Sequence, residues 1–178
     1  MKLLIVSGAA LVGGVLLLLA IAALIGSRLP VGHVASRSIF LHRSNTEIYG
    51  LLRDFGASPS WRADVTRVDL LGQPAGKLNF REHGKQGDIT YELAEDVPGQ
   101  RIVTRIIDQN LGYSGSWTTE LTPENGGTKV TVTENGEVTN VLFRFMSRYI
   151  FGHTATIEGY LQSLAAHFGE SPAQYSER

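Results

Sequence analysis

The sequence contains no cysteine, which excludes disulfide bonds, thiolate nucleophiles, iron–sulfur clusters and cysteine-ligated zinc. Its five histidines show neither the H-x-x-x-H nor the H-E-x-x-H spacing of a metal site. The G-x-S-x-G, Walker A and dinucleotide-binding motifs are also missing. Basic and acidic residues nearly balance, 16 against 17, and no basic block occurs. We therefore expect no cofactor, no metal and no nucleic-acid partner.

A long apolar run opens the chain. From Leu3 to Ile25 no side chain is charged, and Ser7 is the only polar one. As a helix with a rise of about 1.5 Å per residue, this run would reach roughly 35 Å, enough to cross a hydrocarbon core of about 30 Å. We therefore predict a transmembrane anchor over residues 1–27, and a short linker over 28–32.

A cleaved signal peptide is the alternative interpretation of this run. Lys2 supplies a basic start, and Ala20-Ile21-Ala22 has the form of a cleavage site. The apolar run continues beyond that point, which favours the uncleaved anchor. Counting Lys and Arg on either side of the run favours a cytoplasmic position for the rest of the chain. The expected location is thus the cell membrane, with a single pass.

The chain after the linker alternates between few helices and many strands. Residues 33–41 show the alternation of a strand. Ser44 and Glu47 then have the spacing of a capping box, which predicts a helix, and residues 58–61 form a second short turn or helix. Six further strands are predicted at about 65–71, 77–83, 88–95, 101–108, 113–122 and 128–138. Short Gly- and Pro-containing connections between them indicate an antiparallel meander.

The longest predicted helix closes the chain, from about Val141 to Phe168. Apolar side chains and one histidine recur in it at steps of three or four, forming one stripe: Met146, Ile150, His153, Ile157, Leu161, Leu164 and Phe168. Such a stripe needs an apolar surface to cover it, and the meander can supply one by curling. The pattern therefore predicts an α+β domain over 33–170, with a flexible tail over 171–178.

Several local patterns resemble the SRPBCC superfamily, which has the START-like or helix-grip fold. They are Gly115-Ser116-Trp117, residues 123–128, residues 131–136, and Tyr160 to Leu164 in the closing helix. More narrowly, the chain is similar to the polyketide cyclase/dehydrase and lipid transport group of that superfamily. The resemblance implies about seven antiparallel strands curled around a long C-terminal helix, with a deep apolar cavity between them.

His153 and Glu134 are the leading polar candidates for that cavity. His153 lies in the apolar stripe of the closing helix, where a buried imidazole requires a partner. It is either a group that binds ligand or acts as a general acid or base, or a core histidine satisfied by the protein itself. Glu134 shares its strand face with Val130 and Val132, so the period of two turns it inward. It is either a ligand-binding group or a solvated residue at the rim.

The other candidate ligand-binding residues are large and apolar. Trp117 is expected to cover part of the pocket, or to be plain core, and Trp61 to form a lid or to pack on the surface. Met146, Ile150 and Ile157 belong to the stripe that faces the cavity.

Two charged clusters are expected to be solvated. The first is Arg81, Glu82 and His83 near a strand end. The second is Arg144 and Arg148, one turn apart in the closing helix, for which contact with lipid headgroups is the alternative.

The favoured function is a membrane-anchored binding or carrier domain for a hydrophobic small molecule or lipid. An enzyme of the cyclase or dehydratase kind is one alternative, because a shaped pocket with one acid–base residue can perform such reactions. A non-catalytic interaction module at the membrane is the other. We expect binding rather than catalysis, with the membrane and an apolar small molecule as partners; the sequence does not identify a protein partner.

Overall fold

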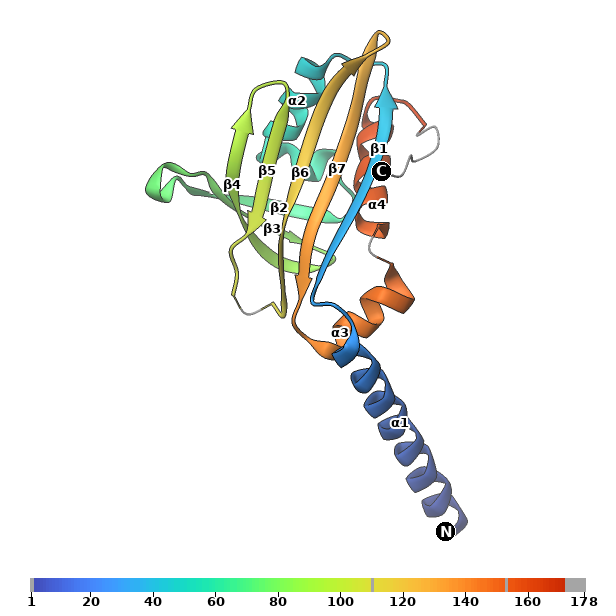
Figure 1. Ribbon diagram of the computed structural model, residues 1–178. Helices are drawn as coiled ribbons and strands as arrows, with labels where there is room; N and C mark the ends of the chain where they lie inside the picture. Colours follow the sequence, from blue (N-terminus) through green and yellow to red (C-terminus); the bar gives the residue numbers. More distant parts are fainter. Residues whose placement is uncertain (1, 110, 153, 172–178) are drawn as a thin grey trace.

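The computed structural model describes residues 2–109, 111–152 and 154–171 (Figure 1). The helices are α1 (Lys2–Arg28), α2 (Asn45–Arg53), α3 (Val141–Met146) and α4 (Ala155–His167), with the short segments η1 (Phe55–Ser60), η2 (Pro74–Gly76) and η3 (Ser147–Phe151). The strands are β1 (Gly32–Leu41), β2 (Val65–Gly72), β3 (Asn79–Gly84), β4 (Gly87–Val97), β5 (Arg101–Ile106), β6 (Tyr113–Glu124) and β7 (Gly127–Val138).

The strands form one antiparallel, curled sheet of seven in the order β1-β7-β6-β5-β4-β3-β2. The first strand, β1, pairs with the last strand, β7, from Gly32 opposite Glu137 to Leu41 opposite Thr128. Strands β1 and β2 therefore form the two edges of the sheet. Helix α4 packs against β1 and β7 (Figure 1). This is the predicted α+β helix-grip architecture, and all seven predicted strands are present.

The hydrophobic core lies where α4 meets the sheet. Ile157, Leu161 and Leu164 of α4 are fully buried, as are Val130 and Val132 of β7. These α4 residues recur at steps of three and four, so one helix face supplies all of them. The inward positions of β7 alternate, as the strand period requires.

The capping box predicted for the first helix of the domain is confirmed. The Ser44 side chain accepts a hydrogen bond from the Glu47 backbone N–H, and the Glu47 carboxylate accepts one from the Ser44 N–H. The helix that this cap begins, α2, buries Ile48 and Leu52. Its end leads into η1, where Phe55 stacks on Phe80 of β3 with ring centroids 4.1 Å apart.

The prediction of one continuous closing helix is wrong. The chain forms α3, then the π-helical segment η3, and then breaks at Gly152 before α4 begins. Gly152 has φ +73° and ψ 157°, a conformation that side chains with a Cβ strongly disfavour. His153, in the middle of the predicted stripe, lies outside the described residues.

This break divides the predicted apolar stripe into a buried part and an exposed part. Ile157 on α4 is fully buried, whereas Met146 and Ile150, before Gly152, are 37% and 63% exposed. The change of direction at Gly152 removes the earlier residues from the face that covers the sheet.

Helix α1 projects away from the domain (Figure 1). Its stretch Leu11–Arg28 has a mean hydropathy of 2.2 and almost no buried surface. By length and composition this helix is able to cross a membrane, and an N-terminal signal sequence has the same properties.

Arg144 connects α1 to the domain, and the expectation that it is solvated is wrong. It is only 9% exposed. Its Nη1 donates to the carbonyls of Gly26 at 3.2 Å and Leu29 at 3.1 Å. Its Nε and Nη2 donate to the carbonyls of Val138 at 2.9 Å and Thr139 at 3.2 Å. One guanidinium thus binds the end of α1 and the end of β7 together.

Close backbone packing accompanies this contact. A Cβ atom at Gly26 would overlap the carbonyl of Val141 in α3, so a glycine is required for α1 and α3 to approach as they do. Downstream of α1, the carbonyl of Val31 accepts a hydrogen bond of 2.9 Å from the Val138 N–H. The short connection predicted over 28–32 is therefore held against the domain.

The Gly152 break can be tested with two matched glycine substitutions. Gly152→Ala forces a Cβ into a disfavoured conformation and should lower the free energy of unfolding by about 1–3 kcal/mol. Gly159→Ala is the control, because Gly159 lies within α4 with open space around it; it should stabilise the protein by about 0.5–1 kcal/mol. Chemical unfolding of the detergent-solubilised protein measures both, and equal effects would contradict a strained break.

Candidate functional site

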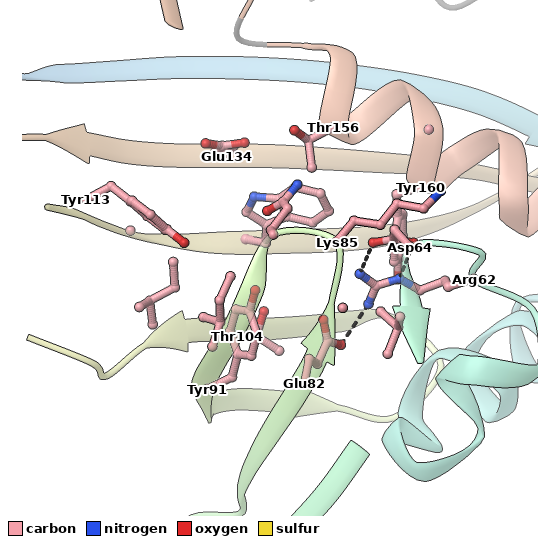
Figure 2. Close-up of a pocket in the computed structure, with 18 of the residues that line it drawn as sticks. Arg62, Asp64, Glu82, Lys85, Tyr91, Thr104, Tyr113, Glu134, Thr156 and Tyr160 are labelled. Atoms are coloured by element: carbon pink, nitrogen blue, oxygen red, sulfur yellow. Dashed lines mark hydrogen bonds and ion pairs between the residues drawn. The ribbon is translucent and has the colours of Figure 1, made fainter. Parts of the chain in front are cut away.

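A cavity of about 1100 Å³ lies between the curled sheet and the C-terminal helical segments (Figure 2). Ligand pockets commonly have volumes of about 300–1,000 Å³, so this one has room for a large organic molecule or a lipid. Apolar side chains from several strands form much of its wall, among them Phe80, Ile89, Ile102 and Ile106. The space enclosed by the curled sheet is therefore packed with side chains where α4 meets β1 and β7, and hollow in the remaining part.

A charged cluster lies in one wall of the cavity (Figure 2). Arg62 follows η1, Asp64 precedes β2, and Glu82 is on β3, which pairs with β2. Arg62 Nη1 lies 2.7 Å from Glu82 Oε1, and Arg62 Nη2 lies 2.8 Å from Asp64 Oδ2. The Arg62 and Glu82 side chains are only 14% and 12% exposed, so this is a largely buried ion pair with a second, more accessible carboxylate.

Burial and ion pairing shift the pKa values of this cluster in opposite directions. Burial raises the pKa of the Glu82 carboxyl, and the charge of Arg62 offsets only part of that increase. Partial burial also raises the pKa of Asp64, but its hydrogen bond to Arg62 and the charge of Arg62 outweigh burial and leave the pKa lowered. Burial alone would lower the pKa of Arg62; the two carboxylates more than compensate and raise it. Arg62 is therefore a permanent cation whose charge is already neutralised.

Aromatic side chains surround the guanidinium. The Arg62 Cζ atom lies 5.4 Å from the centroid of the Tyr160 ring, a cation–π distance. Trp61 and Trp117 meet the same ring edge-on, with centroids 5.3 and 5.5 Å away. Burial raises the pKa of Tyr160 to about 12, so its hydroxyl is protonated at neutral pH and can donate a hydrogen bond. Burial also raises the pKa of Tyr91 on the cavity wall.

A second polar pair lines the cavity from β1 and β7. His33 Nε2 lies 3.1 Å from Glu134 Oε1, and the two side chains are 16% and 22% exposed. His33 is paired in the sheet with Gly136, where a Cβ atom would overlap the imidazole ring. A glycine at this position thus leaves room for the His33 ring beside Glu134. Among the described residues, no group of three or more His, Asp and Glu side chains could hold a metal ion.

The structure distributes the predicted site residues among three environments. Four of them line the cavity: Glu134, Trp117, Trp61 and Ile150. Ile157, on α4, is fully buried in the core. Met146 is on the surface, 37% exposed. His153 lies outside the described residues. The roles assigned to these residues in ligand binding stay predictions.

Sequence reasoning missed the charged cluster. Glu82 was expected at a solvated strand edge, yet it is only 9% exposed and lines the cavity. The period of a strand could have placed it, because Glu82 shares a face with Phe80, which is buried. Arg62 and Tyr160 lacked such a signal, since Arg62 lies in a connection and Tyr160 lies beside the apolar stripe rather than in it.

The seven-stranded curled sheet, the covering helix and the large internal cavity define a helix-grip protein. The family is identified by sequence, since residues 33–169 match the family described as polyketide cyclase / dehydrase and lipid transport. The chain belongs to that family. A comparison with curated protein sequences finds no match.

Solved structures share the fold at low sequence identity. The Zhui aromatase/cyclase from a Streptomyces species is 12% identical, with a TM-score of 0.64 over 76% of this chain and 93% of that one. A START superfamily protein from Mycobacterium smegmatis is 16% identical, with a TM-score of 0.61 over 76% and 96%. The di-domain aromatase/cyclase StfQ of the steffimycin pathway is 17% identical, with a TM-score of 0.61, and this chain spans 50% of its length. At these identities the likeness shows the fold alone.

The structural role of the charged cluster can be tested by removing its cation. Arg62→Met leaves the Glu82 and Asp64 carboxylates uncompensated and should lower the free energy of unfolding at about pH 7 by roughly 3 kcal/mol or more. The matched control is Arg67→Met, because Arg67 forms an exposed pair with Asp69 and should matter far less.

The pH dependence distinguishes this effect from a simple loss of packing. In the wild type the lowered pKa of Asp64 provides stability that is lost as the pH falls through its folded-state value. Without Arg62 the pKa values of both carboxyls rise, so the variant should gain stability as the pH falls. The difference between Arg62→Met and wild type should therefore shrink between about pH 7 and about pH 4.5. A difference that stays constant would contradict the electrostatic account.

Proposed function

We propose that this protein is a membrane-anchored binding or carrier protein for a hydrophobic small molecule or lipid. The observation that carries the proposal is the cavity of about 1100 Å³ with a largely apolar wall. Transferring apolar surface out of water is favourable by about 25 cal/mol per Å², so a long apolar ligand would gain most of its affinity from that wall. A scaffold that serves only as an interaction module has no need of such a hollow interior.

The polar groups in the wall favour a ligand with an uncharged polar end. Arg62 is already neutralised by Glu82 and Asp64, so it offers little net attraction to a phosphate or a carboxylate. Tyr160 is held in its protonated form and can donate to a hydroxyl or carbonyl oxygen. We therefore expect an alcohol, ketone or ester group on an apolar body rather than a free acid.

Helix α1 supports the anchored form of this proposal. An apolar helix of this length, uncovered by the rest of the protein, is suited to cross a bilayer once. Its retention would keep the cavity beside the membrane, where an apolar ligand partitions, and would raise the local concentration of both. The distribution of Lys and Arg beside the helix favours a cytoplasmic position for the domain.

The ligand proposal predicts the effect of filling the cavity. Thr104 on β5 lines the cavity, so Thr104→Phe should sharply reduce the amount of apolar ligand that co-purifies with the protein. Thr122→Phe is the control, because Thr122 is exposed near the far end of β6 and should leave that amount unchanged. Solvent extraction and mass spectrometry measure the ligand per mole of purified protein. Equal loading of the two variants, or empty wild-type protein, would contradict the proposal.

The anchor predicts an intact N-terminus. Mass spectrometry of the full chain purified from membranes should find α1 retained, from Lys2 onwards. A mature chain that begins after Ala22 would show that the apolar helix is a signal peptide, and would remove the anchor from the proposal.

A cyclase or dehydratase activity is the second candidate. It is favoured by the presence of two separate acid–base groupings in one cavity, the His33–Glu134 pair and Glu82 with its raised pKa. Incubating the purified protein with an added ligand before the solvent extraction distinguishes the two candidates. A carrier returns an added ligand chemically unchanged, whereas an enzyme returns a product.

A further inference from the structure

Exposed apolar side chains outside α1 are concentrated in one short segment. Of the ten large apolar residues that are exposed elsewhere in the described chain, five lie in α3 and η3. These five form what is here named the α3–η3 surface: Val141, Phe143, Met146, Tyr149 and Ile150. Phe143, Met146 and Ile150 are spaced by three and four residues, so they share one helical face. The opposite face carries Arg144, which is buried against α1.

The contact between α1 and α3 fixes the depth of this surface relative to the apolar helix. Gly26 of α1 is packed against Val141 and Phe145 of α3. Gly26 is two residues from Arg28, the charged end of α1, and thus about 3 Å from it along the helix axis. If α1 spans a bilayer, its charged end lies near the headgroups, and α3 lies at the same level (Figure 1).

The composition of the surface suits that level of a membrane. Tyr149 is 59% exposed, and tyrosine is enriched at membrane–water interfaces, where its ring contacts acyl chains and its hydroxyl contacts water. Arg148 is exposed next to it and can bind anionic headgroups. An amphipathic helical segment of this kind lies in the interface with its apolar face toward the acyl chains.

We propose that the α3–η3 surface docks on the bilayer that α1 crosses, with the apolar side chains at the boundary between headgroups and acyl chains. The inference rests on the proposed anchoring by α1. A lipid occupant is favoured over a protein partner because the surface is continuous with the end of α1 and is held there by Arg144. The docked domain then has one fixed orientation on the membrane.

The cavity opens at the same place. Phe143 and Ile150 both line the cavity and are 38% and 63% exposed, which puts them at its mouth. Thr156, exposed at the start of α4, and Lys85, exposed in the β3–β4 turn, also line it. Figure 2 shows Lys85, Thr156 and Glu134 around the same space. With the α3–η3 surface docked, the mouth lies against the lipid, so an apolar ligand passes between the leaflet and the cavity without crossing water.

Site-directed spin labelling tests the docking directly, because the chain has no native cysteine to interfere. The full chain, with one cysteine introduced at a time, is reconstituted into vesicles of neutral and anionic phospholipid. Power saturation then compares the accessibility of the label to oxygen, which concentrates in lipid, with its accessibility to a water-soluble nickel complex. Labels at Met146→Cys and Tyr149→Cys should show an oxygen-to-nickel ratio several-fold above that of a label in water.

Two control positions define the aqueous and membrane limits. Leu70→Cys is the aqueous control, because Leu70 is apolar and 61% exposed, close to Tyr149 in both respects, but lies on β2. Leu17→Cys in the middle of α1 is the membrane control. Labels at positions 146 and 149 that are as accessible to the nickel complex as the label at position 70, with the label at position 17 in lipid, would overturn the docking but not the anchor. The α3–η3 surface would then be a binding site for a protein partner. An aqueous label at position 17 would overturn the anchor and the docking with it.

Replacing Arg144 tests whether the junction positions the surface. In the Arg144→Met background the label at position 149 should become more mobile and its oxygen-to-nickel ratio should fall toward the aqueous value. Arg67→Met, at an exposed arginine on β2 outside the α3–η3 surface, is the matched control and should leave the label immobile. Retention of lipid contact in both backgrounds would show that α3 finds the membrane by itself and would overturn the positioning role of Arg144. Because neither 146 nor 149 lines the cavity, ligand loading provides an independent check that each variant is folded.

Discussion

The packing of α4 against β1 and β7 is the constraint on which the rest of the structure depends. Ile157, Leu161 and Leu164 are fully buried in one core cluster with residues of β7, and none of the three lines the cavity. The remaining strands curl beyond the reach of that helix face, so the interior there is lined but not filled. A single helix of this length cannot cover the whole concave side of a seven-stranded sheet. The cavity is therefore a consequence of the mismatch between the two layers.

The charged cluster is compatible with an apolar cavity only as a complete unit. Arg62 has a carboxylate on each side and an aromatic ring against it, so few of its donors remain without an acceptor. A lone carboxylate or guanidinium in the same wall would be costly to bury. This arrangement adds hydrogen-bonding capacity to the wall while keeping its charge low, which is the basis for proposing a ligand with a neutral polar group.

The sheet, the capping box and the covering helix could be predicted because each has a periodic or local signal. The break at Gly152 could not, since the apolar spacing runs on through it and only a backbone conformation that glycine permits divides the helix. The strand period could indicate inward positions for Glu134 and Trp117, and both line the cavity. Trp61, which is in no strand and was expected as a lid or a surface residue, also lines it. Arg62 was missed because its placement depends on partners that are distant in sequence or outside any periodic element, and no local pattern encodes such a meeting.

The Arg144 contacts also bear on how deeply α1 would sit in a membrane under the proposed anchoring. The last carbonyls of a helix have no partner within it, and in hydrocarbon each unpaired one costs several kcal/mol. Here a cation from another part of the chain binds the carbonyl of Gly26 in the last turn of α1 and that of Leu29 just beyond it, and it also opposes the negative end of the helix dipole. The terminus of α1 consequently needs less hydration than a bare helix end, so α1 would tolerate a thicker bilayer if it crosses one as proposed.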